Sequence, residues 1–272
     1  MSSSVLRFED VCLRFGDAPA LDHVSFEMQA GETRVVYGVA GSGETTLLKA
    51  ALGLVKPDSG KIFVFGEDVT NFTENAWFAV RAKMGILFQE GGLFDSMTIA
   101  ENVAYPLINR QARQNGNGAV NNDERVRNTL RFVELERTLD QFPSELSGGM
   151  RRRVGIARAV VTEPPLVLYD SPTAGLDPIT ANTIINLILK ERDLRNAASI
   201  MVTHRFQDGH LMANFRYNPT NGQIERLGPD RSTLNSPVTT QFFVMHEGRL
   251  VFAGTQAELK ASADPYVEKF AR

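Results

Sequence analysis

The pattern of apolar and polar positions changes twice along the chain and divides it into three parts. Over the first ninety residues, short apolar runs punctuated by Gly and Pro predict strands, with one helix at Thr45 to Leu54. From about Thr98 to Val161 the apolar spacing becomes helical. The strands predicted for the first part are Val5 to Phe15, Val24 to Met28, Thr33 to Tyr37, Ile62 to Phe65 and Gly85 to Phe88.

The third part alternates strand and helix. Leu166 to Tyr169 and Ser199 to Val202 are continuous apolar runs on either side of a helical segment, Ile179 to Arg195. Such βαβ alternation predicts a parallel sheet buried on both faces. Ligands of these sheets bind beyond the carboxyl ends of the strands, so we expect the functional site there.

Turn signals and one polar stretch complete the pattern. Asn221-Gly222 and Glu247-Gly248 stand between alternating apolar runs and predict two hairpins. The interval from Asn109 to Asp123 is polar and of low complexity, which predicts a mobile loop between helices.

Composition and charge narrow the functional class. The 272 residues include 29 Lys and Arg against 32 Asp and Glu, a net charge of -3, so nothing indicates a nucleic-acid partner. No apolar run is long enough to cross a bilayer, and Met1 to Val5 lacks a secretory pattern, so we expect a cytosolic chain. The single cysteine, Cys12, excludes a disulfide framework within the chain and is expected simply to pack.

A glycine-rich segment between a predicted strand and a predicted helix is the first candidate site. It reads Gly38-Val39-Ala40-Gly41-Ser42-Gly43-Glu44-Thr45-Thr46. Glycines allow backbone N–H groups to point inward, and the start of a helix adds positive potential, so this context is typical of a phosphate-binding loop. Thr45 supplies the hydroxyl that such loops present to Mg²⁺.

Glu44 departs from the phosphate-loop pattern, which has lysine at that position. The exchange removes an attraction to phosphate and adds a repulsion, each about 4 kcal/mol at contact distance in an effective dielectric of about 20. Lys49 lies more than one helical turn away and is no substitute. Two hypotheses follow for Glu44: a carboxylate folded back onto the loop N–H groups as a tethered anion, or a solvated side chain in a first helical turn.

Two further segments carry candidate ligand chemistry. Pro165 to Asp170 is an apolar strand ending in an acid, an arrangement that can hold magnesium through Asp170. About twenty residues earlier, Ser147-Gly148-Gly149 opens a helix and is either a second anion-binding terminus or simply a capped helix start.

Together these segments resemble the phosphate loop, signature segment and magnesium strand of the ABC (ATP-binding-cassette) ATPases, in the family's order and over essentially the whole chain. The resemblance implies an α/β P-loop NTPase with a mixed sheet core, an N-terminal antiparallel β subdomain and a helical signature subdomain. It also implies one domain over 1–272, with a core lobe at 1–90 and 165–272 and a helical subdomain at 91–164. ATP and Mg²⁺ are the implied cofactors.

The resemblance also assigns roles to single residues. In the family two copies pair head to tail, and ATP lies between one phosphate loop and the partner's signature segment, here Ser147-Gly148-Gly149. Phe15 takes the position of the ring that stacks on adenine, and the other reading of Phe15 is an ordinary strand aromatic. Gln89 resembles the glutamine that senses magnesium and water, Asp177 the dimer-contact residue and His204 the switch histidine.

Ser171 is a second departure from the family pattern. The family usually carries a glutamate there that polarises the attacking water, whereas a hydroxyl does not readily accept a proton near neutral pH. Ser171 can still position water by hydrogen bonding. Slow hydrolysis is therefore expected even when ATP binds.

Several longer runs resemble the ATPase subunits of Mla and Mce type lipid transporters. They are residues 88–98 and 101–107, Met150, Asp177-Pro178-Ile179-Thr180 and the tail 263–270. This resemblance implies a homodimer beneath an integral membrane permease, at the cytoplasmic face of a bacterial inner membrane, and it allows a small accessory regulatory subunit. Leu93, Phe94 and Met97 would contact the permease, or else they pack locally.

One segment does not fit that subgroup, and two other functions stay open. Residues 206–241 are expected to be a surface insertion. Glu44 and Ser171 together also suit a catalytically degenerate cassette that dimerises or regulates without hydrolysis. A soluble cassette acting on DNA or ribosomes is disfavoured, because neither a second cassette nor a long coiled-coil insert is visible and the chain is acidic.

Overall fold

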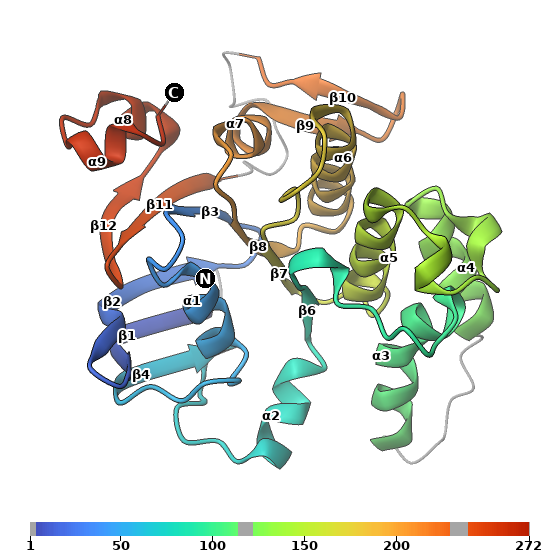
Figure 1. Ribbon diagram of the computed structural model, residues 1–272, viewed down its shortest axis with the longest axis horizontal. Coiled ribbons are helices and arrows are strands. Elements are labelled where there is room, and N and C mark those ends of the chain that lie inside the picture. The colour runs from blue at the N-terminus through green and yellow to red at the C-terminus, as the bar shows by residue number, and fades with distance from the viewer. Residues whose placement is uncertain (1–3, 114–121, 229–238, 272) are drawn as a thin grey trace.

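The computed structural model describes residues 4–113, 122–228 and 239–271, which form two main sheets, a small hairpin and the helices that cover them (Figure 1). The first sheet is antiparallel and has the order β2-β1-β4-β5. Its strands are β1 (Ser4–Phe15), β2 (Ala18–Gln29), β4 (Ser59–Val64) and β5 (Glu67–Asp68). Alternate side chains such as Leu6 and Phe8 are buried, as the period-two pattern predicts.

The second sheet has six strands in the order β12-β11-β3-β8-β7-β6. They are β3 (Thr33–Gly38), β6 (Met84–Leu87), β7 (Leu166–Asp170), β8 (Ala198–Val202), β11 (Thr240–His246) and β12 (Arg249–Gly254). Every neighbouring pair is parallel except β11 and β12, the hairpin predicted at Glu247-Gly248. The carboxyl ends of β3, β7 and β8 therefore lie at one edge.

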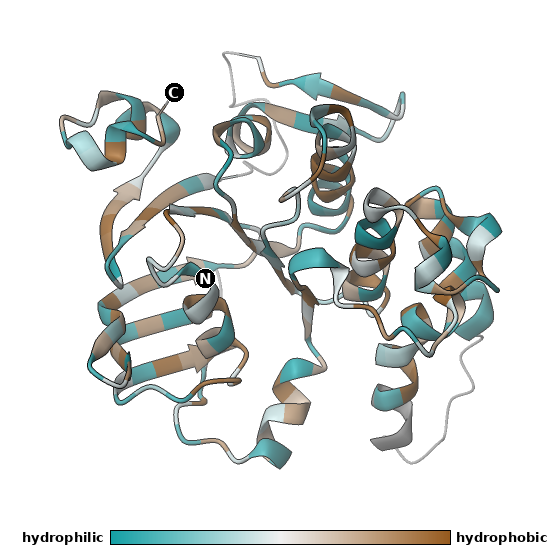
Figure 2. Cartoon of the chain, viewed as in Figure 1, coloured by the Kyte–Doolittle hydropathy of each residue, from teal (hydrophilic) through white to brown (hydrophobic). Residues whose placement is uncertain are grey.

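Both faces of this sheet are buried, which explains the continuous apolar runs of its strands. Along β3, Val35 and Tyr37 belong to one hydrophobic cluster, whereas Val36 belongs to the other. The first cluster contains side chains from the helices on one side, and the second joins the sheet to the antiparallel strands. Figure 2 shows hydrophobic residues running along the central strands. A mixed sheet core with an antiparallel β subdomain is thus confirmed.

Helices cover this framework in groups. The longer ones are α1 (Glu44–Ala51), α2 (Glu74–Arg81), α3 (Ile99–Arg113), α4 (Asn122–Phe132), α5 (Gly148–Val160), α6 (Pro178–Arg195) and α7 (Phe206–Asn214). The short ones are η1 (Gln89–Gly91), η2 (Glu136–Thr138), η3 (Pro143–Glu145), α8 (Gln256–Ala261) and α9 (Pro265–Glu268). Helices α3, α4 and α5 pack on one another at one end of the molecule (Figure 1). No helix within the described ranges is both long and apolar enough to span a membrane.

The structure adds a helix that the sequence pattern did not predict. Helix α2 begins after Thr73, whose hydroxyl accepts a hydrogen bond from Ala76 N at 3.4 Å. Trp77 and Val80 bury one face of α2. A two-turn amphipathic helix presents only a few apolar positions, too few for its period to stand out.

Two predictions about irregular segments are corrected or narrowed. The polar interval from Asn109 to Asp123 is partly helical, because α3 continues to Arg113 and α4 starts at Asn122; residues 114–121 lie outside the described residues. The prediction that 206–241 is a surface insertion is wrong at its start. Helix α7 belongs to the core, with Asp208 and Met212 fully buried.

The rest of that segment is a hairpin followed by a core strand. Strands β9 (Phe215–Asn218) and β10 (Gln223–Arg226) pair antiparallel, which confirms the hairpin predicted at Asn221-Gly222. Residues 229–238 lie outside the described residues, and β11 begins at Thr240 beside β3. Any surface insertion is thereby confined to the stretch between α7 and β11.

Glu191 is an acidic side chain in the buried face of α6, with 1% of its surface exposed. Its nearest cation is Arg195, whose Nε lies 3.0 Å from Oε2 and whose Nη1 also pairs with Glu163 at 2.7 Å. Burial dominates and raises the pKa of Glu191 to about 8. The carboxyl is therefore protonated in the folded chain at neutral pH.

The raised pKa of Glu191 predicts a pH-dependent free energy of unfolding. Between its ordinary value of 4.5 and about 8, the unfolded chain releases a proton that the folded chain keeps, so stability falls as pH rises. We expect Glu191→Gln to remove a slope of at most about 1.4 kcal/mol per pH unit in this window. Urea unfolding from pH 5 to 8 measures it, with the exposed Glu67→Gln as control; parallel curves for the chain and Glu191→Gln would contradict it.

Candidate active site

The glycine-rich segment forms a tight loop between β3 and α1, as its position predicts. Gly43 directly precedes α1 and has a φ of 107°, and a Cβ there would meet Ala20 O at 2.3 Å. A Cβ on Gly38 would lie 2.1 Å from Ser42 Oγ and 2.5 Å from Glu44 Oε1. Both positions therefore require glycine, Gly43 for its left-handed backbone and Gly38 for the close approach of two side chains. Helix α1 starts here, so its free N–H groups and dipole face the loop region.

Thr45 and Asp170 come together at the edge of the parallel sheet. Thr45 Oγ1 lies 3.3 and 3.4 Å from the two carboxylate oxygens of Asp170, at the end of β7. Burial raises the pKa of Asp170, while hydrogen bonds from Thr45 and Ser171 and the charges of Lys49 and His204 act in the opposite direction. A hydroxyl next to a buried carboxylate provides the hard oxygen ligands that Mg²⁺ prefers, so these residues fit the ion.

Lys49 has a role that the sequence did not predict. It is exposed and one turn along α1 from Thr45, and its charge opposes the burial that raises the pKa of Asp170. Lys49 therefore favours the ionised form of the Asp170 carboxylate.

Glu44 is a buried carboxylate aimed into the loop. Only 4% of its surface is exposed, so the hypothesis of a solvated side chain is wrong. The tethered-anion hypothesis is not supported either, because Oε1 accepts no hydrogen bond from any described residue. His204 is close by, with its Nδ1 3.8 Å from Glu44 Oε1. A polyphosphate would meet uncompensated negative charge here, so the loop backbone fits a nucleotide but the Glu44 side chain does not.

His204 converges on the same loop from the end of β8. Its Nδ1 lies 2.6 Å from Gly38 O, and because a carbonyl only accepts, Nδ1 must donate. The Nε2 of a neutral ring then carries the lone pair.

Asp208 on α7 braces two loops behind this histidine and was missed from sequence. Its Oδ2 accepts hydrogen bonds from Thr173 Oγ1 at 2.5 Å and Thr203 Oγ1 at 2.6 Å. Thr203 precedes His204, and Thr173 follows Ser171 by two residues. A fully buried carboxylate thus joins the segments after β7 and β8. In the sequence, Asp208 was marked only by its position four residues after His204.

Ser171 occupies a strained position next to Asp170. Its φ is 49°, a region that non-glycine residues rarely adopt, and its hydroxyl donates to Asp170 Oδ1 at 3.4 Å. Its carbonyl accepts a hydrogen bond from Arg152 Nη1 at 3.0 Å, and Arg152 Nη2 donates to Ala174 O at 3.0 Å. Arg152, on α5, therefore links the helical part to the Asp170–Ala174 segment, a contact that the three-arginine run did not predict.

The remaining predicted residues lie at the surface. Ser147 caps α5 by accepting a hydrogen bond from Met150 N at 3.2 Å, and Gly148 beside it is exposed. Asp177 caps α6 by accepting hydrogen bonds from Ile179 N and Thr180 N. The pKa of Asp177 is lowered first by a hydrogen bond from the Thr180 side chain and then by those from the backbone.

Phe15 and Gln89 are also exposed. The Phe15 ring, at the end of β1, is 57% exposed. The Gln89 side chain, at the start of η1, makes no hydrogen bond to a described residue. Within one chain the structure brings together the loop, Asp170, Ser171 and His204. Phe15, Gln89, Asp177, Ser147 and Gly148 are exposed.

The family model described as ABC transporter matches residues 21–174, more than half of the chain and from within β2 to just past Ser171. The chain belongs to the ABC transporter family. Relatives of this cassette include the intermembrane phospholipid transport system ATP-binding protein MlaF of Haemophilus influenzae, 30% identical over 87% of this chain and 88% of that protein. The methionine import ATP-binding protein MetN 2 of Rhodococcus jostii is 35% identical over 86% of this chain and 68% of that protein.

A plant relative and solved structures agree with this assignment. The Arabidopsis thaliana protein TRIGALACTOSYLDIACYLGLYCEROL 3, chloroplastic, is 30% identical over 99% of this chain and 74% of that protein. The dimeric post-hydrolysis state of the ATP-binding cassette MJ0796 bound to ADP and Pi superposes with a TM-score of 0.73, at 25% identity, over 92% of this chain and 98% of that one.

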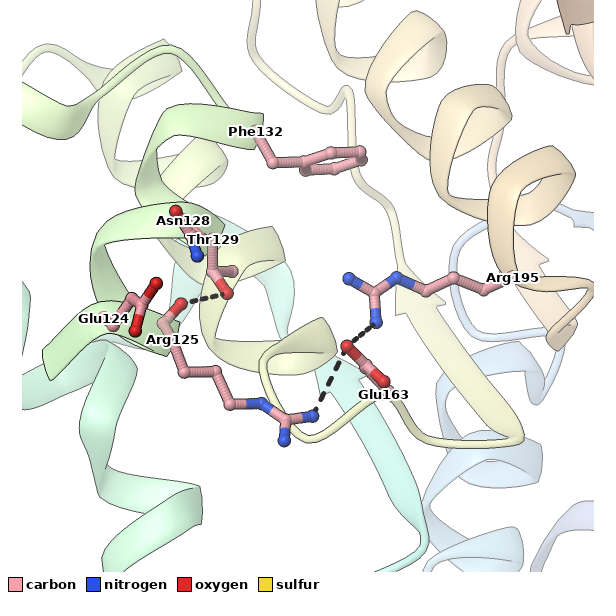
Figure 3. A pocket seen from close by; sticks show the side chains of 7 residues that line it. All are labelled: Glu124, Arg125, Asn128, Thr129, Phe132, Glu163 and Arg195. Carbon is pink, nitrogen blue, oxygen red and sulfur yellow. Dashed lines mark hydrogen bonds and ion pairs between the residues drawn. The ribbon is translucent and has the colours of Figure 1, made fainter. Parts of the chain in front are cut away.

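A pocket of about 520 Å³ lies outside the site, between α4 and the end of α6 (Figure 3). Glu163 lies between two arginines of the lining and pairs with Arg125 at 3.5 Å and with Arg195 at 2.7 Å. The pocket contains no residue of the phosphate loop. Because Glu163 already pairs with both guanidinium groups, the pocket is a polar contact region rather than an anion site.

The burial of Glu44 predicts that neutralising it stabilises the chain. An unpaired buried polar group costs about 1–3 kcal/mol, and for a domain of this size each kcal/mol shifts Tm by about 2–4 °C. We expect Glu44→Gln to raise Tm by a few degrees in buffer with EDTA and no nucleotide, measured by calorimetry. An unchanged or lower Tm would mean that donors hold the carboxylate, as a tethered anion requires.

Proposed function

We propose that this cassette is the ATP-binding subunit of a lipid transporter, acting as a head-to-tail homodimer beneath an integral permease at the cytoplasmic face of a bacterial inner membrane. The observation that carries the proposal is the contact between Thr45 and Asp170 beside the glycine loop. It supplies a magnesium position next to a helix N-terminus, at the sheet edge where nucleotides bind.

The residues divide into those that bind and those that sense. Gly38, Gly41, Ser42, Gly43, Thr45 and Thr46 would hold the phosphates, Thr45 and Asp170 the Mg²⁺, and Phe15 the adenine. The exposed Ser147 and Gly148 would meet the partner's triphosphate, which suits their position at a free helix start. Gln89, Asp177 and His204 would report the bound state to the permease and to the second copy.

Hydrolysis is proposed to be slow because Ser171 stands where the family usually carries its general base. Ser171 hydrogen-bonds Asp170 and can orient a water but cannot readily take its proton. The buried Glu44 also favours a second function, a regulatory cassette that dimerises without turnover. Both readings share the fold and differ only in nucleotide binding and turnover.

The lipid assignment is supported by two relatives whose names contain a lipid, MlaF and TRIGALACTOSYLDIACYLGLYCEROL 3. The methionine and sulfate names of other relatives show that identity alone does not select the cargo. An exposed aromatic pair suits the permease contact: Phe94 is 39% and Tyr105 38% exposed, with ring centroids 4.8 Å apart. Leu93, by contrast, packs on the core.

Nucleotide binding and turnover are tested in four chains. We expect Glu44→Lys to bind ATP at least tenfold more tightly than the chain itself by calorimetry, because a repulsion becomes an attraction. Turnover should rise only modestly in Ser171→Glu and strongly in the double variant. If the chain itself already binds and hydrolyses ATP as well as the double variant, the electrostatic argument is wrong.

The cargo is tested in the complex with its permease in lipid nanodiscs. With the double variant Glu44→Lys, Ser171→Glu supplying turnover, we expect ATPase activity to respond to phospholipid and not to methionine or sulfate. Stimulation by a small hydrophilic solute alone would reject a lipid transporter while leaving the ATP-binding subunit intact.

A further inference from the structure

Two buried oxygen atoms in the phosphate loop lack hydrogen-bond partners, and both lie against Gly38. Ser42 is 2% and Glu44 4% exposed, and Ser42 Oγ and Glu44 Oε1 find no partner among the described residues. Both atoms lie within 2.5 Å of the point where a Cβ on Gly38 would stand. A loop of this kind normally presents donors to an anion, yet here it presents a buried anion and a hydroxyl.

The chemistry of these atoms matches a cation. Buried polar groups are almost always satisfied, so two adjacent unsatisfied oxygens at a ligand site indicate a ligand that binds oxygen. Carboxylate and hydroxyl oxygens are ligands of hard divalent ions, and a buried negative charge raises affinity for positive charge. The nearest ring atom of His204 is Nδ1, 3.8 Å from Glu44 Oε1, and it donates to Gly38 O, so the ligands of this site are the two oxygens.

We propose that Glu44 and Ser42 hold a divalent cation of their own, distinct from the Mg²⁺ position at Thr45 and Asp170. On the proposed function, on which this inference rests, nucleotide would then bind with two divalent ions at each phosphate loop. The extra ion would lie where other phosphate loops place a lysine ammonium and would offset the charge of Glu44. The cassette would thus have exchanged a fixed positive charge for one that depends on the concentration of divalent metal.

The consequence is a nucleotide site gated by divalent metal. The apparent affinity for nucleotide should rise more steeply with the concentration of free divalent metal than in an ordinary cassette. The reason is that two ions, rather than one, bind with each triphosphate. Replacing Glu44 by lysine should restore the ordinary order, since the ammonium occupies the place of the ion.

The test counts Mn²⁺ per chain by the electron paramagnetic resonance signal of free Mn²⁺, with and without saturating ATP. We expect two Mn²⁺ per bound ATP for the full chain and one for Glu44→Gln and Glu44→Lys. Ser42→Ala should weaken the extra site by about three- to tenfold, a range typical of losing one oxygen contact. Glu67→Gln, an exposed change on β5, should leave both counts unchanged.

The outcomes separate this inference from the proposed function. One Mn²⁺ per ATP, equal in the chain and in Glu44→Gln, would overturn the second ion while leaving nucleotide binding in place. If no ATP is retained at any metal concentration, the proposed function fails, and the nucleotide-free titration decides the ion: a Mn²⁺ site lost in Glu44→Gln supports it, and equal titrations reject it. A higher Tm of Glu44→Gln in EDTA shows that loss of the site is not loss of the fold.

Discussion

Thr45 and Asp170 lie 125 residues apart in sequence, and their contact depends on the parallel alignment of β3 and β7 on either side of β8. Parallel strands place their carboxyl ends at one edge, so the loops that follow them converge there without any local signal. The glycine loop, the acid at the end of β7 and the histidine after β8 all use this edge. Burial on both faces keeps the strands in register, and the site depends on that register.

The site combines this inherited framework with an inverted charge. The loop geometry, the α1 dipole and the Thr45–Asp170 pair all suit a magnesium triphosphate, whereas Glu44 opposes it. A buried, unpartnered carboxylate is costly, and such costs concentrate where ligands bind. Ser171 adds backbone strain directly after Asp170. The strained backbone of Ser171 and the unsatisfied oxygens of Ser42 and Glu44 thus lie in the segments that follow β3 and β7.

Contacts within one chain also show what a second copy would add. Arg152 and Asp208 brace the segments after β7 and β8 from behind, so the edge is rigid on its buried side. Ser147, Gly148, Phe15 and Asp177 remain exposed. Their exposure suits a site completed between two copies, as in the proposed head-to-tail dimer.

The sequence by itself determined strands β3, β7 and β8, their order and the positions of Thr45, Asp170 and His204 at their ends, because hydrophobic period and turn residues act over a few neighbours. It also located both charge departures. Only the tertiary structure decided that Glu44 is buried against Gly38, that α7 is a core helix and that Arg152 and Asp208 hold the loops. These facts depend on which distant segments cover a residue. A hydrophobic pattern of period two or 3.6 shows which face of a strand or helix is buried, but not which other elements pack against that face.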